Sequence, residues 1–184
     1  PGRYLETLAA LKDAAPELDI QVTTEAAGVF DVSAKSDCLR GVRPGWASIS
    51  VRGIARDPNA ADEVYGQCEA QGTRVQHILY DAKDAALLAR WQMEGVVRST
   101  QVDRLLVLGR YADSRKYLRT DIVPLIRNGP LTSPWMVCAF GPLEHTCLAH
   151  VAALGGELRV EFENSLTDTS GIPWTDNASS VAAL

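Results

Sequence analysis

Three charged residues near the C-terminal end have the spacing of a chemical site. Arg159, Glu161 and Glu163 alternate with apolar residues over positions 158–164, so a strand here would present all three to one face. Charges on the inner face of a sheet are costly unless they pair with each other or bind something. Two interpretations stay open: a functional site that faces an interior, or an edge strand with one face in water.

Histidines and cysteines do not form a recognisable site by themselves. His145 and His150 lie five residues apart in a predicted helix and do not share a face, and the sequence has no HxH or HxxxH pair. We predict that His77, inside an apolar segment, is a buried core residue rather than a ligand. The four cysteines form no CxxC pair and have no regular spacing, so we expect neither a zinc finger nor a disulfide framework. No GxSxG elbow is present either.

Six short segments, most of them apolar at nearly every position, predict strands buried on both faces. They cover residues 18–24, 46–52, 75–81, 104–110, 135–140 and 158–163. Helical patterns are found at residues 4–15, 57–72, 84–97, 120–128, 143–154 and 177–184. Residues 25–44 have no clean period, and we predict an ordered loop there with at most one short helix.

Repeated strand–helix units predict an α/β fold with parallel strands and right-handed crossovers. An open doubly wound sheet and a closed (β/α)8 barrel both fit, and periodicity leaves the choice open. In either fold the site gathers where strands end. Besides the 159–164 group, this places the hydroxyls of Thr23, Ser48 and Ser50 among the candidates.

Composition limits the classes of function. The 184 residues are 46% hydrophobic and 22% charged, which fits one globular domain spanning residues 1–184. The net charge of -5 is spread along the chain, so a nucleic-acid partner is not expected. No apolar run approaches the roughly 20 residues that cross a bilayer. The first residues, Pro1-Gly2-Arg3-Tyr4, have neither the apolar core nor the cleavage site of a signal peptide. We therefore expect no membrane association and a cytoplasmic location.

Several segments, in order, resemble one enzyme family. They include Ile20-Gln21-Val22-Thr23-Thr24, Trp46-Ala47-Ser48-Ile49-Ser50, Leu79-Tyr80-Asp81 and Trp135-Met136-Val137-Cys138-Ala139-Phe140-Gly141. The strongest match is Gly155-Gly156-Glu157-Leu158-Arg159-Val160-Glu161-Phe162-Glu163-Asn164. Together they resemble the beta-keto acid cleavage enzymes typified by 3-keto-5-aminohexanoate cleavage enzyme.

The resemblance implies a (β/α)8 TIM barrel of which this chain holds strands three to eight, without the first two. It implies a divalent metal, usually Zn²⁺, held by Glu163 together with an HxH pair in the part not present here. Arg159 would belong to the charged network that positions the catalytic base, and Thr23 with Ser48 or Ser50 would line the substrate pocket. The implied reaction converts a beta-keto acid and acetyl-CoA into acetoacetate and a CoA thioester. A homo-oligomer is also implied.

The chain departs from the family at several positions. Asn164 stands where the family has the aspartate base, and an amide cannot accept that proton. Glu161 replaces a glycine and could supply the missing carboxylate. Gln76 stands in a segment where the family has acidic pocket residues, and Pro142 stands where the family has an arginine. Two alternatives therefore remain: another barrel aldolase, lyase or isomerase acting on a small anion, or an inactive truncated barrel.

Overall fold

The computed structural model describes residues 1–25, 28–109, 122, 125–126 and 134–184. The chain divides into two compact units. The first unit comprises Pro1–His77 and Leu87–Val102, and the second comprises Ile78–Ala86 and Asp103–Leu184. Each unit is described by itself.

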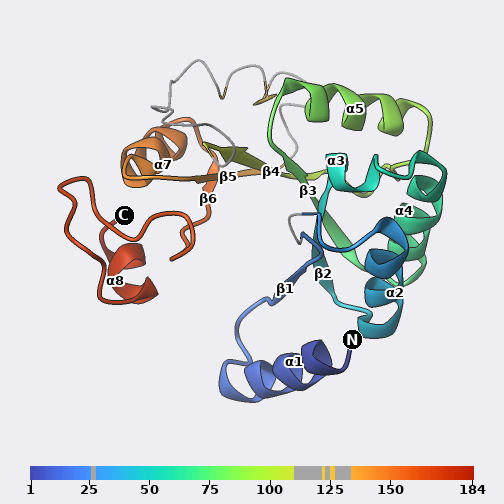
Figure 1. Cartoon of the computed structure of the whole chain (residues 1–184), viewed down its shortest axis with the longest axis horizontal. Helices are drawn as coiled ribbons and strands as arrows, with labels where there is room; N and C mark the ends of the chain where they lie inside the picture. The colour runs from blue at the N-terminus through green and yellow to red at the C-terminus, as the bar shows by residue number, and fades with distance from the viewer. Residues whose placement is uncertain (26–27, 110–121, 123–124, 127–133) are drawn as a thin grey trace. The chain divides into compact units, whose positions relative to one another are not determined.

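The first unit is built from short parallel strands and helices (Figure 1). Its elements are α1 (Gly2–Ala14), β1 (Gln21–Thr23), α2 (Val32–Val42), β2 (Trp46–Ser50), α3 (Val51–Ile54), the 3-10 turn η1 (Pro58–Ala60), α4 (Ala61–Ala70), most of β3 (Arg74–Leu79) and the larger part of α5 (Ala82–Met93). β1 pairs with β2 in parallel, with Thr23 opposite Ser48. Gln21 donates to the side chain of Gln76 on β3 at 3.1 Å, which joins polar groups of β1 and β3.

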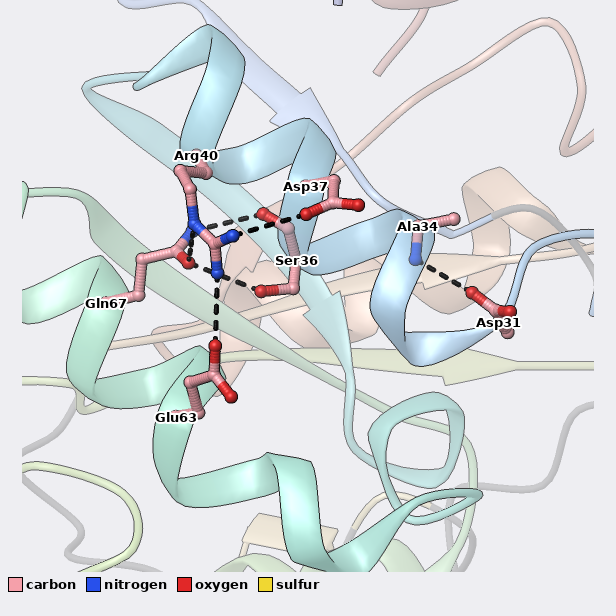
Figure 2. Close-up of polar contacts among 7 residues, drawn as sticks. All are labelled: Asp31, Ala34, Ser36, Asp37, Arg40, Glu63 and Gln67. Atoms are coloured by element: carbon pink, nitrogen blue, oxygen red, sulfur yellow. Dashed lines mark hydrogen bonds and ion pairs between the residues drawn. The ribbon is translucent and has the colours of Figure 1, made fainter.

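Helices α2 and α4 lie side by side in the first unit, and polar side chains join them (Figures 1 and 2). Asp31 caps α2 by accepting from the Ala34 N–H at 2.8 Å. Arg40 of α2 donates to Gln67 at 3.2 Å and contacts Glu63 at 3.1 Å, both on α4. Arg40 and Glu63 are exposed and Gln67 is half-buried, so the contacts orient the two helices and contribute little net stability.

A polar cluster is buried between helices and sheet in the first unit. His77 of β3 is fully buried, and its Nε2 lies 3.0 Å from the Gln101 carbonyl. Gln101 in turn donates to the Tyr65 carbonyl at 3.0 Å, and the Tyr65 ring packs against His77 at 5.4 Å between centroids. The prediction that His77 is a core residue is therefore confirmed.

The second unit contains the end of β3, β4 (Asp103–Leu108), β5 (Trp135–Ala139), α7 (Glu144–Ala153), β6 (Glu157–Leu158) and α8 (Asn177–Ala182). β4 pairs with β5 in parallel, and β5 pairs with β6 in the same sense. One face of these strands forms an apolar cluster made of Ile78, Tyr80, Leu105, Val107, Met136, Cys138 and Phe140. Cys138 is buried and packs in this cluster as a small hydrophobic residue.

Most predicted elements are confirmed within a few residues, and two are wrong. Residues 25–44 contain an 11-residue helix, α2, rather than a loop with one short helix. Its buried face includes the polar residues Lys35 and Ser36 beside Val32, Leu39 and Val42. These two residues interrupt the helical spacing of apolar residues by which a buried helix is predicted. The last strand ends at Leu158 instead of continuing to residue 163. The helix predicted at residues 120–128 and the end of the strand at residue 110 lie largely outside the described residues.

Smaller corrections concern helix ends. Asp176 caps α8, which begins at Asn177, through a capping box formed with Ser179. Asn177 instead accepts the main-chain N–H of Phe162 at 2.9 Å. Pro58 opens a 3-10 turn that precedes α4, so the predicted helix at 57–72 begins with a tighter turn. Among helices in the described part of the chain, none has the length and hydropathy needed to span a bilayer.

Candidate functional site

The carboxyl end of β5 and the segment after β6 come together in the second unit (Figure 1). Arg159 continues the pairing of β6, because its N–H donates to the Val137 carbonyl at 2.9 Å. The chain turns away from β5 at Gly141, whose φ of 97° favours glycine. The Gly141 N–H donates to the Asn164 carbonyl at 2.9 Å. Residues 159–164 are thus tied at both ends to the region where β5 ends.

Arg159 and Glu161 form an ion pair within this segment. Both the Nε and Nη2 atoms of Arg159 contact Oε1 of Glu161. The two side chains are only 24% and 28% exposed, so the pair is partly shielded from water. Burial raises the pKa of Glu161, the Arg159 charge opposes that rise, and the nearby Glu163 carboxylate adds to it.

Arg159, Glu161 and Glu163 are therefore neighbours, although the predicted reason was wrong. They were expected to share one face of a strand, but β6 ends before Arg159. The Asn164 N–H donates to the Glu161 carbonyl at 3.0 Å, so the chain turns over residues 161–164. This turn leaves Glu163 exposed and buries Asn164.

Asn164 holds a second carboxyl group that the sequence analysis did not include. Its Nδ2 donates to Oε1 of Glu144 at 3.2 Å. Glu144 begins α7 and is 1% exposed. Burial raises the pKa of Glu144 and the Glu161 charge adds to that rise, while hydrogen bonds from Asn164 and the main chain of Glu161 oppose it.

The signal that could have identified Glu144 is its position. A charged residue within five positions of the end of a predicted strand, at the first turn of the next helix, lies where active sites of parallel α/β folds gather. The site residues expected from the sequence lie at the strand ends themselves, whereas Glu144 lies in the first turn of the helix that follows.

The predicted hydroxyl residues lie in the first unit. Thr23 is exposed, and its Oγ1 accepts from the Glu25 N–H at 3.1 Å. Ser50 is buried and caps α3 by accepting from the Gly53 N–H at 3.2 Å, so its hydroxyl has a structural role. Ser48 is fully buried, and its Oγ has no hydrogen-bond partner among the described residues. Because buried hydroxyls are normally hydrogen-bonded, the Ser48 hydroxyl is the one of the three that still requires a partner.

The described residues do not by themselves form a metal site. Within them, no group of three His, Cys, Asp or Glu side chains is placed to hold an ion. Glu163 is exposed and is the one predicted ligand that the described chain offers. A complete zinc site, with the four ligands or three ligands and water that zinc requires, needs donors beyond these residues.

Comparison with known proteins decides the family. The family model described as beta-keto acid cleavage enzyme matches residues 1–184. The chain belongs to the beta-keto acid cleavage enzyme family. It therefore belongs among enzymes that act on beta-keto acids. No curated protein matches the chain.

Solved structures confirm the fold class. The chain is similar to a type I 3-dehydroquinate dehydratase from Clostridium difficile, with a TM-score of 0.60 and 9% identity over 97% of this chain and 71% of that one. It is also similar to a protein described as an orotidine 5'-phosphate decarboxylase from Streptomyces avermitilis, with a TM-score of 0.50 and 13% identity over 95% of this chain and 74% of that one. Both have TIM-barrel-like folds, so the chain has the fold of a partial (β/α) barrel.

Proposed function

We propose that this protein transfers an acyl group from a beta-keto acid to CoA, using acetyl-CoA as co-substrate and releasing acetoacetate. Membership of the beta-keto acid cleavage family supports the substrate class. The observation that carries the proposal is the ion pair of Arg159 and Glu161, with Glu163 and Asn164 in the same turn after β6. In the same proposal β1 to β6 correspond to the third to eighth strands of the family barrel, and the protein is a homo-oligomer.

The arrangement suits chemistry on an anionic keto acid. Such a reaction removes a proton from the carbon between two carbonyl groups and must stabilise the resulting enolate charge. A fixed guanidinium stabilises the enolate charge, and a nearby proton acceptor removes the proton. Arg159 is held in place by Glu161, so its charge is pre-positioned at the end of the sheet.

Asn164 requires a change in the expected role of this position. An amide cannot accept a proton, and in this protein it donates a hydrogen bond to a carboxyl group instead. We therefore assign Asn164 a positioning role. Glu161, which could have replaced the missing carboxylate, is already committed to Arg159.

A divalent metal, most simply Zn²⁺, belongs to the proposal through Glu163, with its remaining ligands outside the described residues. When bound, such an ion stabilises enolate charge as a Lewis acid. Because the described residues do not complete its site, the roles above are derived without it. Thr23 and Ser48 or Ser50 are proposed to contact substrate; the Ser50 hydroxyl accepts from the Gly53 N–H and still has its own proton to donate.

The test is acetoacetate release by the full-length protein from a panel of beta-keto acids with acetyl-CoA. Product formation that requires both substrates supports the proposal. Glu163→Gln should lower the metal content and abolish turnover. The matched control is Glu157→Gln, which removes the same charge from an exposed position on β6. Turnover that is independent of acetyl-CoA, or equal metal content in wild type and Glu163→Gln, would contradict the respective part of the proposal.

A further inference from the structure

Glu144 is a buried carboxyl group without a cationic partner among the residues that the structure describes. It lies at the first turn of α7 and is 1% exposed. The nearest cationic group of the adjoining segment, Arg159, is paired with Glu161. In the described part of the chain, no ion pair to Glu144 is formed. A carboxylate buried in this way is costly when ionised, which makes it a stronger proton acceptor than an exposed carboxylate.

The surroundings hold this carboxyl group in one orientation. Oε1 accepts from Asn164 Nδ2 at 3.2 Å, and Asn164 is itself 4% exposed. Main-chain hydrogen bonds fix both residues, because the Gly141 N–H donates to the Asn164 carbonyl and the Glu144 N–H donates to the Gly141 carbonyl. Oε2 of Glu144 is buried without a hydrogen-bond partner among the described residues. One oxygen is thus anchored, and the other keeps an unmet hydrogen-bonding capacity that a proton or a substrate group would satisfy.

The two carboxyl groups of this site have different environments. Glu161 is paired with a guanidinium, which favours its ionised form, whereas Glu144 is paired with an amide. Other titratable groups near Glu144 are His145, which contacts Ser180 at 3.1 Å, and Cys147 one turn along α7. Glu144 is therefore the carboxyl group of this site that no cation holds among the described residues.

We propose that Glu144 is the proton acceptor of the reaction and that Asn164 is the residue that positions it. This inference rests on the proposed function. The Glu144 carboxylate takes the proton from the carbon between the two carbonyls of the beta-keto acid, and the electron pair of that C–H bond becomes the enolate. The enolate attacks the acetyl thioester and releases CoA thiolate. The thiolate then attacks the original keto carbon, and the C–C bond breaks to leave the acetoacetate enolate. That enolate takes the proton back from Glu144.

The decisive variant is Glu144→Gln in the full-length protein. Glutamine keeps the size of the side chain and can still accept from Asn164, so a purely structural role would be preserved. If Glu144 accepts the proton, kcat falls by about 100-fold or more with KM little changed, the usual scale for loss of a general base. The limb of the wild-type pH profile that reports this base should also disappear. Glu157→Gln, an exposed change of the same kind on β6, should retain wild-type kcat.

A double variant distinguishes chemistry from misfolding. Glu144→Gln combined with Asn164→Asp exchanges the amide and the carboxylate while keeping one of each and a hydrogen bond between them. The proposal expects this exchange to recover at least 10-fold of the lost kcat. A Glu144→Gln protein that turns over within about two-fold of wild type would overturn the proposal.

A readout without turnover separates this inference from the proposed function. Side-chain carboxyl carbons are followed by 13C NMR during a pH titration of the full-length protein labelled at glutamate. The proposal expects the Glu144 carboxyl to titrate above the exposed ones in wild type and its signal to be missing in Glu144→Gln, while the Glu161 signal, which burial also raises, is identified by its loss in Glu161→Gln. If wild type shows no turnover with any beta-keto acid, the proposed function fails, and this titration still decides whether Glu144 holds a proton. If Glu144→Gln removes no elevated carboxyl signal, the proposal is overturned by that result alone.

Discussion

Gly156 is the position where the packing next to the site is tightest. It lies between α7 and β6, three residues before Arg159. A Cβ atom added here would lie 2.5 Å from two carbons of the Trp135 indole ring, Cη2 and Cζ3, and 2.7 Å from Val151 Cγ1. Both neighbours are buried, and both belong to the second unit. Gly156→Ala therefore tests whether the approach of β6 to β5 and α7 is as close as described.

The size of the effect follows from the contacts. Non-bonded carbons prefer about 3.5–4.0 Å, so the indole or β6 must move by roughly 1 Å to admit a methyl group. The Trp135 ring is rigid and its strand is paired on both sides. Overpacking of this kind costs about 1–3 kcal/mol. We therefore expect the free energy of unfolding of Gly156→Ala to fall by that amount, despite the small gain of about 0.4–1 kcal/mol that alanine brings at an unstrained position.

The measurement is urea unfolding followed by far-ultraviolet circular dichroism. Gly45→Ala is the matched control, because its Cβ would meet nothing within 4 Å, and its free energy of unfolding should change by less than about 0.5 kcal/mol. Replacing the indole with the smaller ring in Trp135→Phe should relieve the clash, with a coupling energy of at least about 0.5 kcal/mol in the double-mutant cycle. If Gly156→Ala is as stable as Gly45→Ala, the close packing of β6 is refuted.

Two further predictions concern buried polar groups. Ser50→Ala should lower the free energy of unfolding by about 1 kcal/mol because it removes the cap of α3. Ser48→Ala should change the free energy of unfolding little, because the lost hydroxyl has no partner in the described residues. Equal losses of the two variants in urea unfolding would contradict this difference. Because the folded-state pKa of Glu144 is raised, its contribution is present at low pH and is lost as pH rises from about 4.5 through the raised pKa. Glu144→Gln should therefore become more stable relative to wild type as pH rises over this interval, and a constant difference between the two urea midpoints would count against the burial of this carboxyl.

The strands were predictable because buried parallel strands are apolar at nearly every position. Residues 46–50 and 135–139 show this pattern and form β2 and β5. The helix α2 was missed for a physical reason: its buried face includes Lys35, 4% exposed, and Ser36, 7% exposed. Such residues count as polar in a sequence pattern, although the aliphatic stem of a lysine packs well against other side chains.

The candidate site was predictable in composition but not in geometry. Alternation of Arg159, Glu161 and Glu163 indicated a charged group, and the structure keeps the three together. It does so through a local ion pair and a turn, which a periodicity argument cannot distinguish from a strand. Glu144 could not be joined to this group from the sequence, because its hydrogen bond to Asn164 connects residues 20 positions apart.

The most direct test of the account is acetoacetate formation by wild type and Glu144→Gln, with acetyl-CoA and the best beta-keto acid of the panel. The account predicts turnover by wild type that requires both substrates and falls by about 100-fold in the variant, with recovery in the Glu144→Gln, Asn164→Asp exchange. Wild-type turnover that Glu144→Gln retains in full would contradict the assigned chemistry at this site. Absence of turnover with every beta-keto acid, in the presence of added zinc, would contradict the proposed reaction itself.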